Sequence, residues 1–193
     1  MPAVRDRMIP GVLTVRDYLK LPDDAVRYEI LEGSLHVTPS PTTTHQSLSG
    51  RLQGAIYTHA VLTGQGAVFS APTDLVLSVT SVVQPDLIYV ARDRRRIITP
   101  RRLEGAPTLV VEVLSLSTKQ RDETAKYALY AKHRIPYYWI VDPVGKTLRE
   151  YALAGNTYGL VVHLGLGDVF VPKLFPGLTI ALDDLFAPLF GES

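Results

Sequence analysis

The segment TLVVEVLS, residues 108–115, constrains the fold more than any other part of the chain. Alternate side chains of a β-strand share a face, so its odd-numbered residues point one way and its even-numbered residues, Glu112 among them, point the other. Both faces are apolar apart from Glu112, which predicts a central strand covered on two sides. Burying an unpaired ionised carboxylate is very costly, so Glu112 must find a cation, a metal ion or a proton.

A simpler alternative places Glu112 just past the covered region, where it pairs with a surface Lys or Arg. A lone glutamate would favour this alternative, because paired structural acids outnumber catalytic ones. A second acid changes the balance. In VVQPDLIYV, residues 82–90, Asp86 shares a strand face with apolar neighbours. Pro85 cannot donate to a ladder, so this strand must lie at an edge, begin there or open locally.

Two acids near the ends of neighbouring strands could coordinate one hard cation through oxygen. Mg²⁺ usually takes one or two carboxylates and keeps several waters for a phosphate substrate. A third acid, Glu29 in YEILEG (28–33), could join them from a predicted hairpin, although the alternation there leaves its burial open. The sequence therefore predicts a divalent metal site with Asp86 and Glu112 as carboxylate ligands.

The order of the predicted elements gives the fold class. Strand patterns dominate, with two substantial helices, one before and one within the strand series. They are a hairpin over 27–38, an amphipathic helix over 44–62, strands over 66–91, a helix over about 119–133, an aromatic strand over 136–143 and hairpins after it. We expect one α/β or α+β domain over 1–193, with a mixed sheet flanked by helices. Its core is expected over about 24–143, with a C-terminal meander over 144–193.

Composition excludes several classes of protein. The chain is 46% hydrophobic and 20% charged, which is typical of a globular domain. Its 20 basic and 19 acidic residues give a net charge of +1, which argues neither for nor against a nucleic-acid partner. The absence of cysteine excludes disulfides and thiolate sites. We find no signal peptide and no apolar run near the roughly 20 residues that span a bilayer, so a soluble cytoplasmic protein is expected.

The spacing and context of these acids resemble the PD-(D/E)XK nuclease superfamily and, more specifically, the Uma-two family of endonucleases. The matching residues cover most of 28–143: YEILEG (28–33), His45 after a proline-rich turn, PDLIYV (85–90), PTLVVEVLS (107–115), DETAKYALY (122–130) and IPYYWIVDP (135–143). The resemblance implies a restriction endonuclease-like core and metal-dependent cleavage of phosphodiester bonds. Mg²⁺ or Mn²⁺ is the implied cofactor, and the implied partner is nucleic acid, with DNA expected and RNA left open.

One position departs from the superfamily pattern. The pattern's lysine sits two residues after the glutamate, where this chain has Leu114. The family offers a replacement in Lys126, on the following helix. Asp122, Lys126 and Tyr130 are spaced to line one helix face, so Lys126 could lean toward Glu112. The alternative is a surface Asp122–Lys126 ion pair, worth about 0.3–0.5 kcal/mol.

Two further features are candidate substrate contacts. His45 points inward at the start of its helix, where it could touch the substrate, orient Glu29 or be an ordinary core histidine. The segment ARDRRRIITPRR (91–102) holds six arginines and links the strands that bear the two acids. We expect Arg94, Arg95 and Arg96 to lie within reach of the site and contact backbone phosphates. A solvated connector is the equally weighted alternative.

The predicted activity is therefore that of a metal-dependent endonuclease. Asp86, Glu112 and the Val113 carbonyl would hold the metal, and Lys126 would orient water or stabilise the charge on the phosphate. Glu29 would bind a second metal or position water. One rival is an inactive nuclease-fold protein that binds DNA or a protein partner, since Leu114 vacates the usual lysine position. Another is a purely structural oligomerisation domain.

A homodimer is the simplest assembly for cutting two strands. The apolar ending LDDLFAPLF (182–190) must be covered, and Phe186, Leu189 and Phe190 have the spacing of a helical apolar face, although Pro188 limits that helix. We expect this ending to pack back onto its own sheet, with dimerisation through a sheet edge. Contact with a partner subunit is the alternative.

Overall fold

The computed structural model describes residues 11–22 and 26–190. The expected start of the core near residue 24 lies outside the described residues. The elements are α1 (Val15–Tyr18), β1 (Arg27–Leu31), β2 (Ser34–Thr38), α2 (Thr43–Ile56), η1 (Tyr57–Val61), β3 (Gly66–Ser70), β4 (Leu75–Ser78), β5 (Ser81–Val83), β6 (Leu87–Ala91), η2 (Arg92–Ile97), β7 (Leu103–Glu104), β8 (Leu109–Val113), α3 (Lys119–Arg121), η3 (Asp122–Lys126), α4 (Tyr127–Lys132), β9 (Tyr137–Asp142), β10 (Thr147–Ala154), β11 (Thr157–Leu164), β12 (Val169–Phe170), β13 (Ile180–Ala181) and α5 (Leu182–Leu185).

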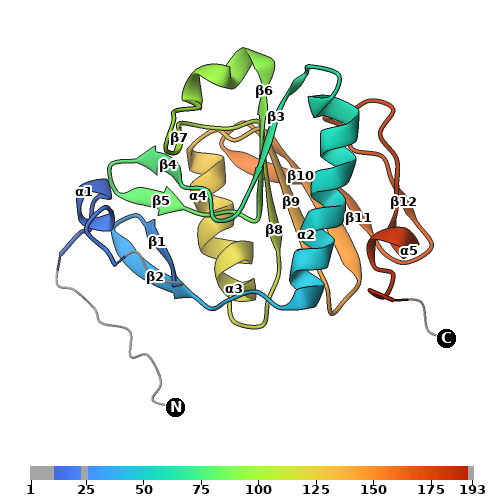
Figure 1. The fold of residues 1–193 in the computed structure, drawn as a ribbon, viewed down its shortest axis with the longest axis horizontal. Helices are drawn as coiled ribbons and strands as arrows, with labels where there is room; N and C mark the ends of the chain where they lie inside the picture. The colour runs from blue at the N-terminus through green and yellow to red at the C-terminus, as the bar shows by residue number, and fades with distance from the viewer. Residues whose placement is uncertain (1–10, 23–25, 191–193) are drawn as a thin grey trace.

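The described strands form a five-stranded sheet, a six-stranded sheet and a two-stranded ribbon (Figure 1). The orders are β2-β1-β5-β4-β7, β11-β10-β9-β8-β6-β3 and β12-β13. The β8–β9 and β4–β7 pairs are parallel and the other pairs antiparallel, so both larger sheets are mixed. The predicted mixed α/β fold is confirmed.

Strand β8 is central and covered on both faces, as its sequence predicts. Its odd-numbered residues lie in one apolar cluster with Leu48, Leu52 and Ile56 of α2. Val110 and Leu114 lie in a second cluster with Leu129 and Tyr130 of α4. Helices α2 and α4 therefore flank opposite faces of the six-stranded sheet.

The segment VVQPDLIYV is two strands, although we expected one. Strand β5 ends at Val83 in the five-stranded sheet, and β6 begins at Leu87 in the six-stranded sheet. Pro85 lies at the crossing, where no ladder hydrogen bond is required of it. Because the chain passes here from one sheet to the other, the ends of the two sheets lie next to each other. Strand β1 therefore lies near the start of β6 and the end of β8.

The two predicted long helices are present, and each contains a π-helical turn. Helix α2 continues into η1, and η3 lies between α3 and α4. Single π-turns are frequent at functional sites, because the extra residue shifts the side chains around the axis. In the described part of the chain, no helix combines the length and the apolar character that crossing a membrane would need.

The C-terminal segment packs back onto its own domain. Leu182 and Leu185 of α5 are buried in the cluster that contains α2, and the Arg51 guanidinium of α2 donates to the carbonyls of Asp184, Leu185 and Ala187. The predicted helical face is wrong beyond that point. Helix α5 ends at Leu185, and Leu189 and Phe190 are exposed, since Pro188 disfavours helix in the residue before it.

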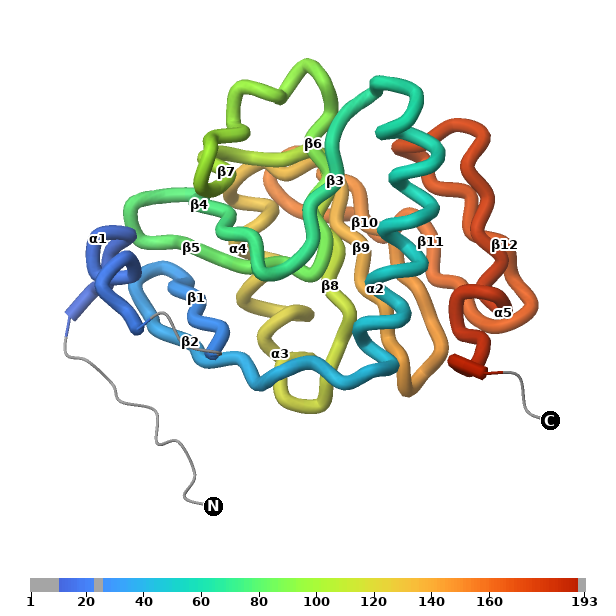
Figure 2. Tube along the Cα trace, in the orientation of Figure 1, coloured from blue at the N-terminus to red at the C-terminus, as the bar shows by residue number. Residues whose placement is uncertain are grey.

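The connection from β2 to α2 completes the frame of the site. Residues 39–42 pass beside the loop that precedes α3, in the lower part of the tube drawing (Figure 2). Thr42 caps α2, because its hydroxyl accepts a hydrogen bond from the His45 backbone N–H. His45 is thereby fixed in the first turn, facing the ends of β6 and β8.

Candidate active site

A cavity of about 550 Å³ is lined by residues from both sheets and from the starts of α2 and α3. Several buried or partly buried charged side chains line it. The carboxylates on its wall are Glu29, Asp86, Glu112 and Asp122, and the cations are Arg27, Arg121 and Lys126. Four acidic and three basic side chains therefore line the cavity, in addition to His45.

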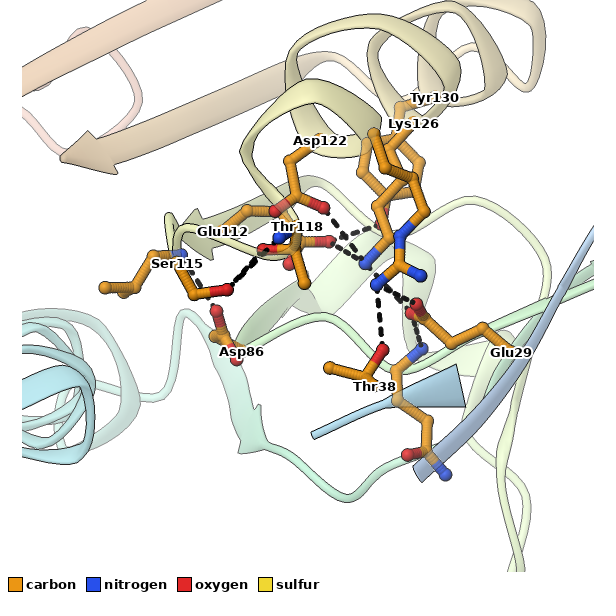
Figure 3. Close-up of polar contacts among 12 residues, drawn as sticks. Glu29, Thr38, Asp86, Glu112, Ser115, Thr118, Asp122, Lys126 and Tyr130 are labelled. Atoms are coloured by element: carbon orange, nitrogen blue, oxygen red, sulfur yellow. Dashed lines mark hydrogen bonds and ion pairs between the residues drawn. The ribbon is translucent and has the colours of Figure 1, made fainter. Parts of the chain in front are cut away.

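Lys126 lies at the centre of this charge cluster (Figure 3). Its Nζ is 2.9 Å from Glu112 Oε1, 2.9 Å from Glu29 Oε1 and 3.5 Å from Asp122 Oδ1. Only 2% of Lys126 is exposed, so the surface-pair alternative is wrong. Burial alone would lower the pKa of Lys126, but attraction to the three carboxylates outweighs it and raises that pKa. The ammonium therefore stays charged.

Glu29 connects β1 to the crossing between the two sheets and to the helical segment that carries Arg121 and Lys126. Its Oε1 accepts a hydrogen bond from the Gln84 backbone N–H at 2.9 Å, and its Oε2 lies 3.3 Å from Arg121 Nη2. Burial would raise the pKa of Glu29, but Lys126, Arg121 and the Gln84 N–H lower it to about 2. Glu29 is thus an ionised partner for Lys126.

Glu112 is in the opposite electrostatic state. It is 3% exposed, and its Oε1 accepts from Lys126 Nζ and from the Tyr130 hydroxyl at 2.7 Å. Burial raises the pKa of Glu112 to about 8, with repulsion from Asp122 and Asp86 adding to burial and Lys126 opposing it. The alternative of a surface ion pair is wrong for this residue too. Glu112 therefore holds a proton far more readily than Glu29 does.

Asp86 lies across the ladder from Glu112. Leu87 pairs with Val111 in the antiparallel β6–β8 register, so Asp86, directly before β6, faces Glu112 of β8. Asp86 Oδ2 accepts from the Val113 backbone N–H at 2.8 Å and lies 3.0 Å from His45 Nε2.

His45 pairs with Asp86, a partner that the sequence did not predict: we expected contact with the substrate, with Glu29 or with the core. Its Nδ1 is buried and makes no hydrogen bond with the described residues. Arg27 Nη1 approaches the other oxygen of Asp86 at 3.5 Å. His45 and Arg27 together fix the orientation of the Asp86 carboxylate.

The arginine-rich connector lies elsewhere, and the expectation that it reaches the site is wrong. Helix η2 follows the end of β6 that is opposite Asp86, about 17 Å away at the usual rise of a five-residue strand. Arg94 donates to the carbonyls of Ala106 and Pro107. Arg95 and Arg96 are exposed, and none of the three arginines lines the cavity.

A family model described as "Uma2: Putative restriction endonuclease" matches residues 15–183. The chain belongs to the Uma2 family. The crystal structure of a "putative nuclease belonging to DUF820 from Anabaena variabilis ATCC 29413" is similar in fold, with a TM-score of 0.73 at 20% sequence identity over 90% of this chain and 97% of that chain. None of the curated proteins compared with the chain matches it.

From the sequence we expected Lys126 to take the place of the lysine that the superfamily pattern has at position 114. Leu114 is buried in the apolar cluster under α4. Lys126 comes from η3, one helical element later, and its ammonium reaches Glu112 Oε1. The contact between Lys126 and Glu112 that the sequence suggested is therefore present.

Two cavity cations were missed by the sequence reasoning. Arg27 lies two residues before Glu29 on the same strand face, and that alternation was a usable signal. Arg121 directly precedes Asp122, and its Nη2 also donates to the Thr38 hydroxyl at 2.8 Å. Nothing local marks Arg121, because its partners come from β1 and β2.

The donor set fits a hard divalent cation. Asp86 and Glu112 supply two carboxyl groups and Val113 a backbone carbonyl, which are donor types that Mg²⁺ takes, and Mg²⁺ requires only one or two carboxylates. Oxygens of Glu29 and Asp122 are also buried without hydrogen bonds. In the described part of the chain, no three His, Asp or Glu side chains are grouped to hold an ion by themselves. Any ion bound here would therefore need water or substrate oxygens as further ligands.

Proposed function

We propose that this protein is a metal-dependent endonuclease that hydrolyses phosphodiester bonds of nucleic acid, with DNA as substrate. The observation that carries the proposal is the buried contact of Lys126 with Glu112, in the same cavity wall as Asp86. Acid pairs on adjacent strands next to a fixed ammonium suit the stabilisation of charge on a phosphate.

Asp86, Glu112 and the Val113 carbonyl would hold Mg²⁺ or Mn²⁺. The bound ion would lower the pKa of a coordinated water and offset the negative charge that develops on the phosphate. Lys126 keeps its proton and directs Nζ into the cavity, where it stabilises that charge or orients the water. Glu29, expected from sequence to bind a second ion or position water, holds the Lys126 ammonium in place.

A protein that binds nucleic acid or a protein partner without cutting is the second candidate. It is favoured by the pairing of each acid with a protein cation: Glu112 with Lys126, and Asp86 with His45 and Arg27. Such a protein has no need to bind a metal ion tightly, whereas the endonuclease does.

Plasmid nicking tests the proposal directly. Supercoiled plasmid should be nicked with Mg²⁺ or Mn²⁺ and remain intact in EDTA, because water activation and charge neutralisation both need the ion. The Glu112→Gln protein serves as the control for a contaminating nuclease. No nicking with either metal, together with no measurable metal binding, would leave the non-cutting candidate.

Replacing His45 with asparagine should weaken metal binding. The imidazole orients Asp86, and loss of such a supporting contact typically lowers metal affinity about 10–100-fold. Titration of Mn²⁺ followed by calorimetry measures the effect. His163→Asn is the matched control, because His163 is exposed and does not line the cavity. Unchanged affinity in His45→Asn would assign His45 to the substrate or to packing.

We further propose that the single domain pairs as a homodimer through β11. This eight-residue edge strand of the six-stranded sheet exposes Leu160 and Val161. Unpaired edges that carry apolar side chains favour pairing with another chain. Light scattering at micromolar concentration should give twice the monomer mass. A monomer mass would contradict the dimer and leave an enzyme that nicks one strand.

A further inference from the structure

The reacting groups of the proposed site are almost completely buried. Glu29, Asp86, Glu112 and Lys126 are each at most 5% exposed, and they lie on the wall of a cavity of about 550 Å³. This volume falls in the range of small-molecule pockets. A phosphate must leave the surface of a paired duplex to reach such groups. An unpaired strand can do so, because its backbone bends freely.

Hydroxyl groups and two guanidinium groups line the path into the cavity. Arg27 and Arg121 each keep part of the side chain accessible, at 17% and 15%. Hydroxyls bind phosphate oxygens without adding charge. The hydroxyl side chains on the wall are Thr38, Ser40, Thr42, Thr44, Ser115, Ser117 and Thr118. This lining suits a single phosphodiester backbone that enters the cavity.

Two aliphatic side chains belong to the same cavity lining yet project into solvent. Leu116 is 94% exposed and Val144 is 81% exposed. They follow β8 and β9, which are parallel neighbours, so the two loops stand at the same end of the sheet. One exposed aliphatic side chain is ordinary. Two on neighbouring loops that line the same cavity form an apolar rim.

We infer that the substrate of this site is an unpaired strand of nucleic acid, and that Leu116 and Val144 pack against the bases that flank the phosphate to be cut. Paired bases hide their faces in the stack, whereas unpaired bases expose them to apolar side chains. The inference rests on the proposed endonuclease function and specifies its substrate class.

Cleavage of matched oligonucleotides provides the first test. A labelled single strand, the same strand in a full duplex, and that duplex with a central unpaired bulge are compared in Mn²⁺. The single strand and the bulge should be cut at least about tenfold faster than the full duplex, since opening the duplex opposes cutting. Equal or faster cutting of the full duplex would overturn the inference.

Rim variants test the two assigned residues. Leu116→Ser and Val144→Ser should each lower the rate on the single strand about five- to tenfold, through loss of base contacts. Leu62→Ser and Val79→Ser are the matched controls, because both side chains are exposed and neither lines the cavity. Wild-type rates in the two rim variants would overturn the assignment.

Binding separates this inference from the proposed activity. Fluorescence anisotropy of the same oligonucleotides with Glu112→Gln protein needs no cleavage. Binding to the single strand should be about tenfold tighter than to the duplex, and Leu116→Ser should reduce that preference. If nothing is cut but this preference is present, the endonuclease proposal fails and the substrate assignment stands. Equal binding to the single strand and the duplex, or no binding to either, would overturn the inference. In the second case the apolar rim formed by Leu116 and Val144 would be left for a protein partner.

Discussion

Replacing Lys126 with methionine is expected to lower the free energy of unfolding by about 3–5 kcal/mol. The variant loses the ammonium that contacts Glu29, Glu112 and Asp122, which are all buried. Methionine keeps most of the side-chain volume, so the loss reports the uncompensated carboxylates and not a cavity. Urea denaturation followed by circular dichroism measures it. Cleavage should also disappear at temperatures where the variant remains folded.

Lys132→Met is the matched control for this substitution. Lys132 ends the same helical segment, but its ammonium pairs with Glu32 at the surface, where both side chains are largely exposed. Exposed ion pairs of this kind contribute about 0–1 kcal/mol. Equal small losses in both variants would mean that the buried carboxylates take up protons at no cost, and would contradict the central role of Lys126.

Local patterns were sufficient to predict the elements that build the site. The alternation in 108–115 predicted a strand covered on two faces, and the structure has β8 between two apolar clusters. The hairpin over 27–38 and the helix that begins near 44 were also predicted, because turn residues and helical spacing act over a few residues. The need for a partner to Glu112 was also predictable, because Glu112 is the single charged residue in an otherwise apolar strand.

The position of the arginine connector could have been predicted from chain order. Asp86 lies directly before β6 and Glu112 near the end of β8, while the connector joins the end of β6 to the start of β8. In an antiparallel pair, those ends lie away from the two acids. The expectation that Arg94, Arg95 and Arg96 lie near the site overlooked this topology.

Other features depend on tertiary structure that no short pattern encodes. The chain changes sheets at Gln84–Asp86, and only this crossing brings Glu29 of β1 to Lys126. The π-turn η3 carries the buried Asp122 and Lys126, and its sequence resembles ordinary helix. The pairing of Glu29 with Arg121 and Lys126 therefore could not be predicted from local sequence.

Replacing Glu112 with glutamine is expected to lower the cleavage rate about 10³-fold while leaving stability nearly unchanged. The carboxylate is the proposed metal ligand, and an amide oxygen is a weaker ligand for a hard cation. The fold should tolerate the change, because the pKa of Glu112 is raised to about 8 and glutamine has nearly the size and shape of the protonated carboxyl group. The amide oxygen can still accept from Lys126 and from the Tyr130 hydroxyl.

Glu150→Gln provides a matched buried control for Glu112→Gln. Glu150 is also buried, but it accepts from the Trp139 indole N–H and does not line the cavity. Its variant should cut at the wild-type rate in the Mn²⁺ assay. The free energy of unfolding of Glu112→Gln should stay within about 1 kcal/mol of wild type, as when a hydrogen-bonded group keeps its partners. Cleavage by Glu112→Gln within tenfold of wild type would remove this carboxylate from the mechanism, whereas a large loss of stability would show that its charge is needed to balance Lys126.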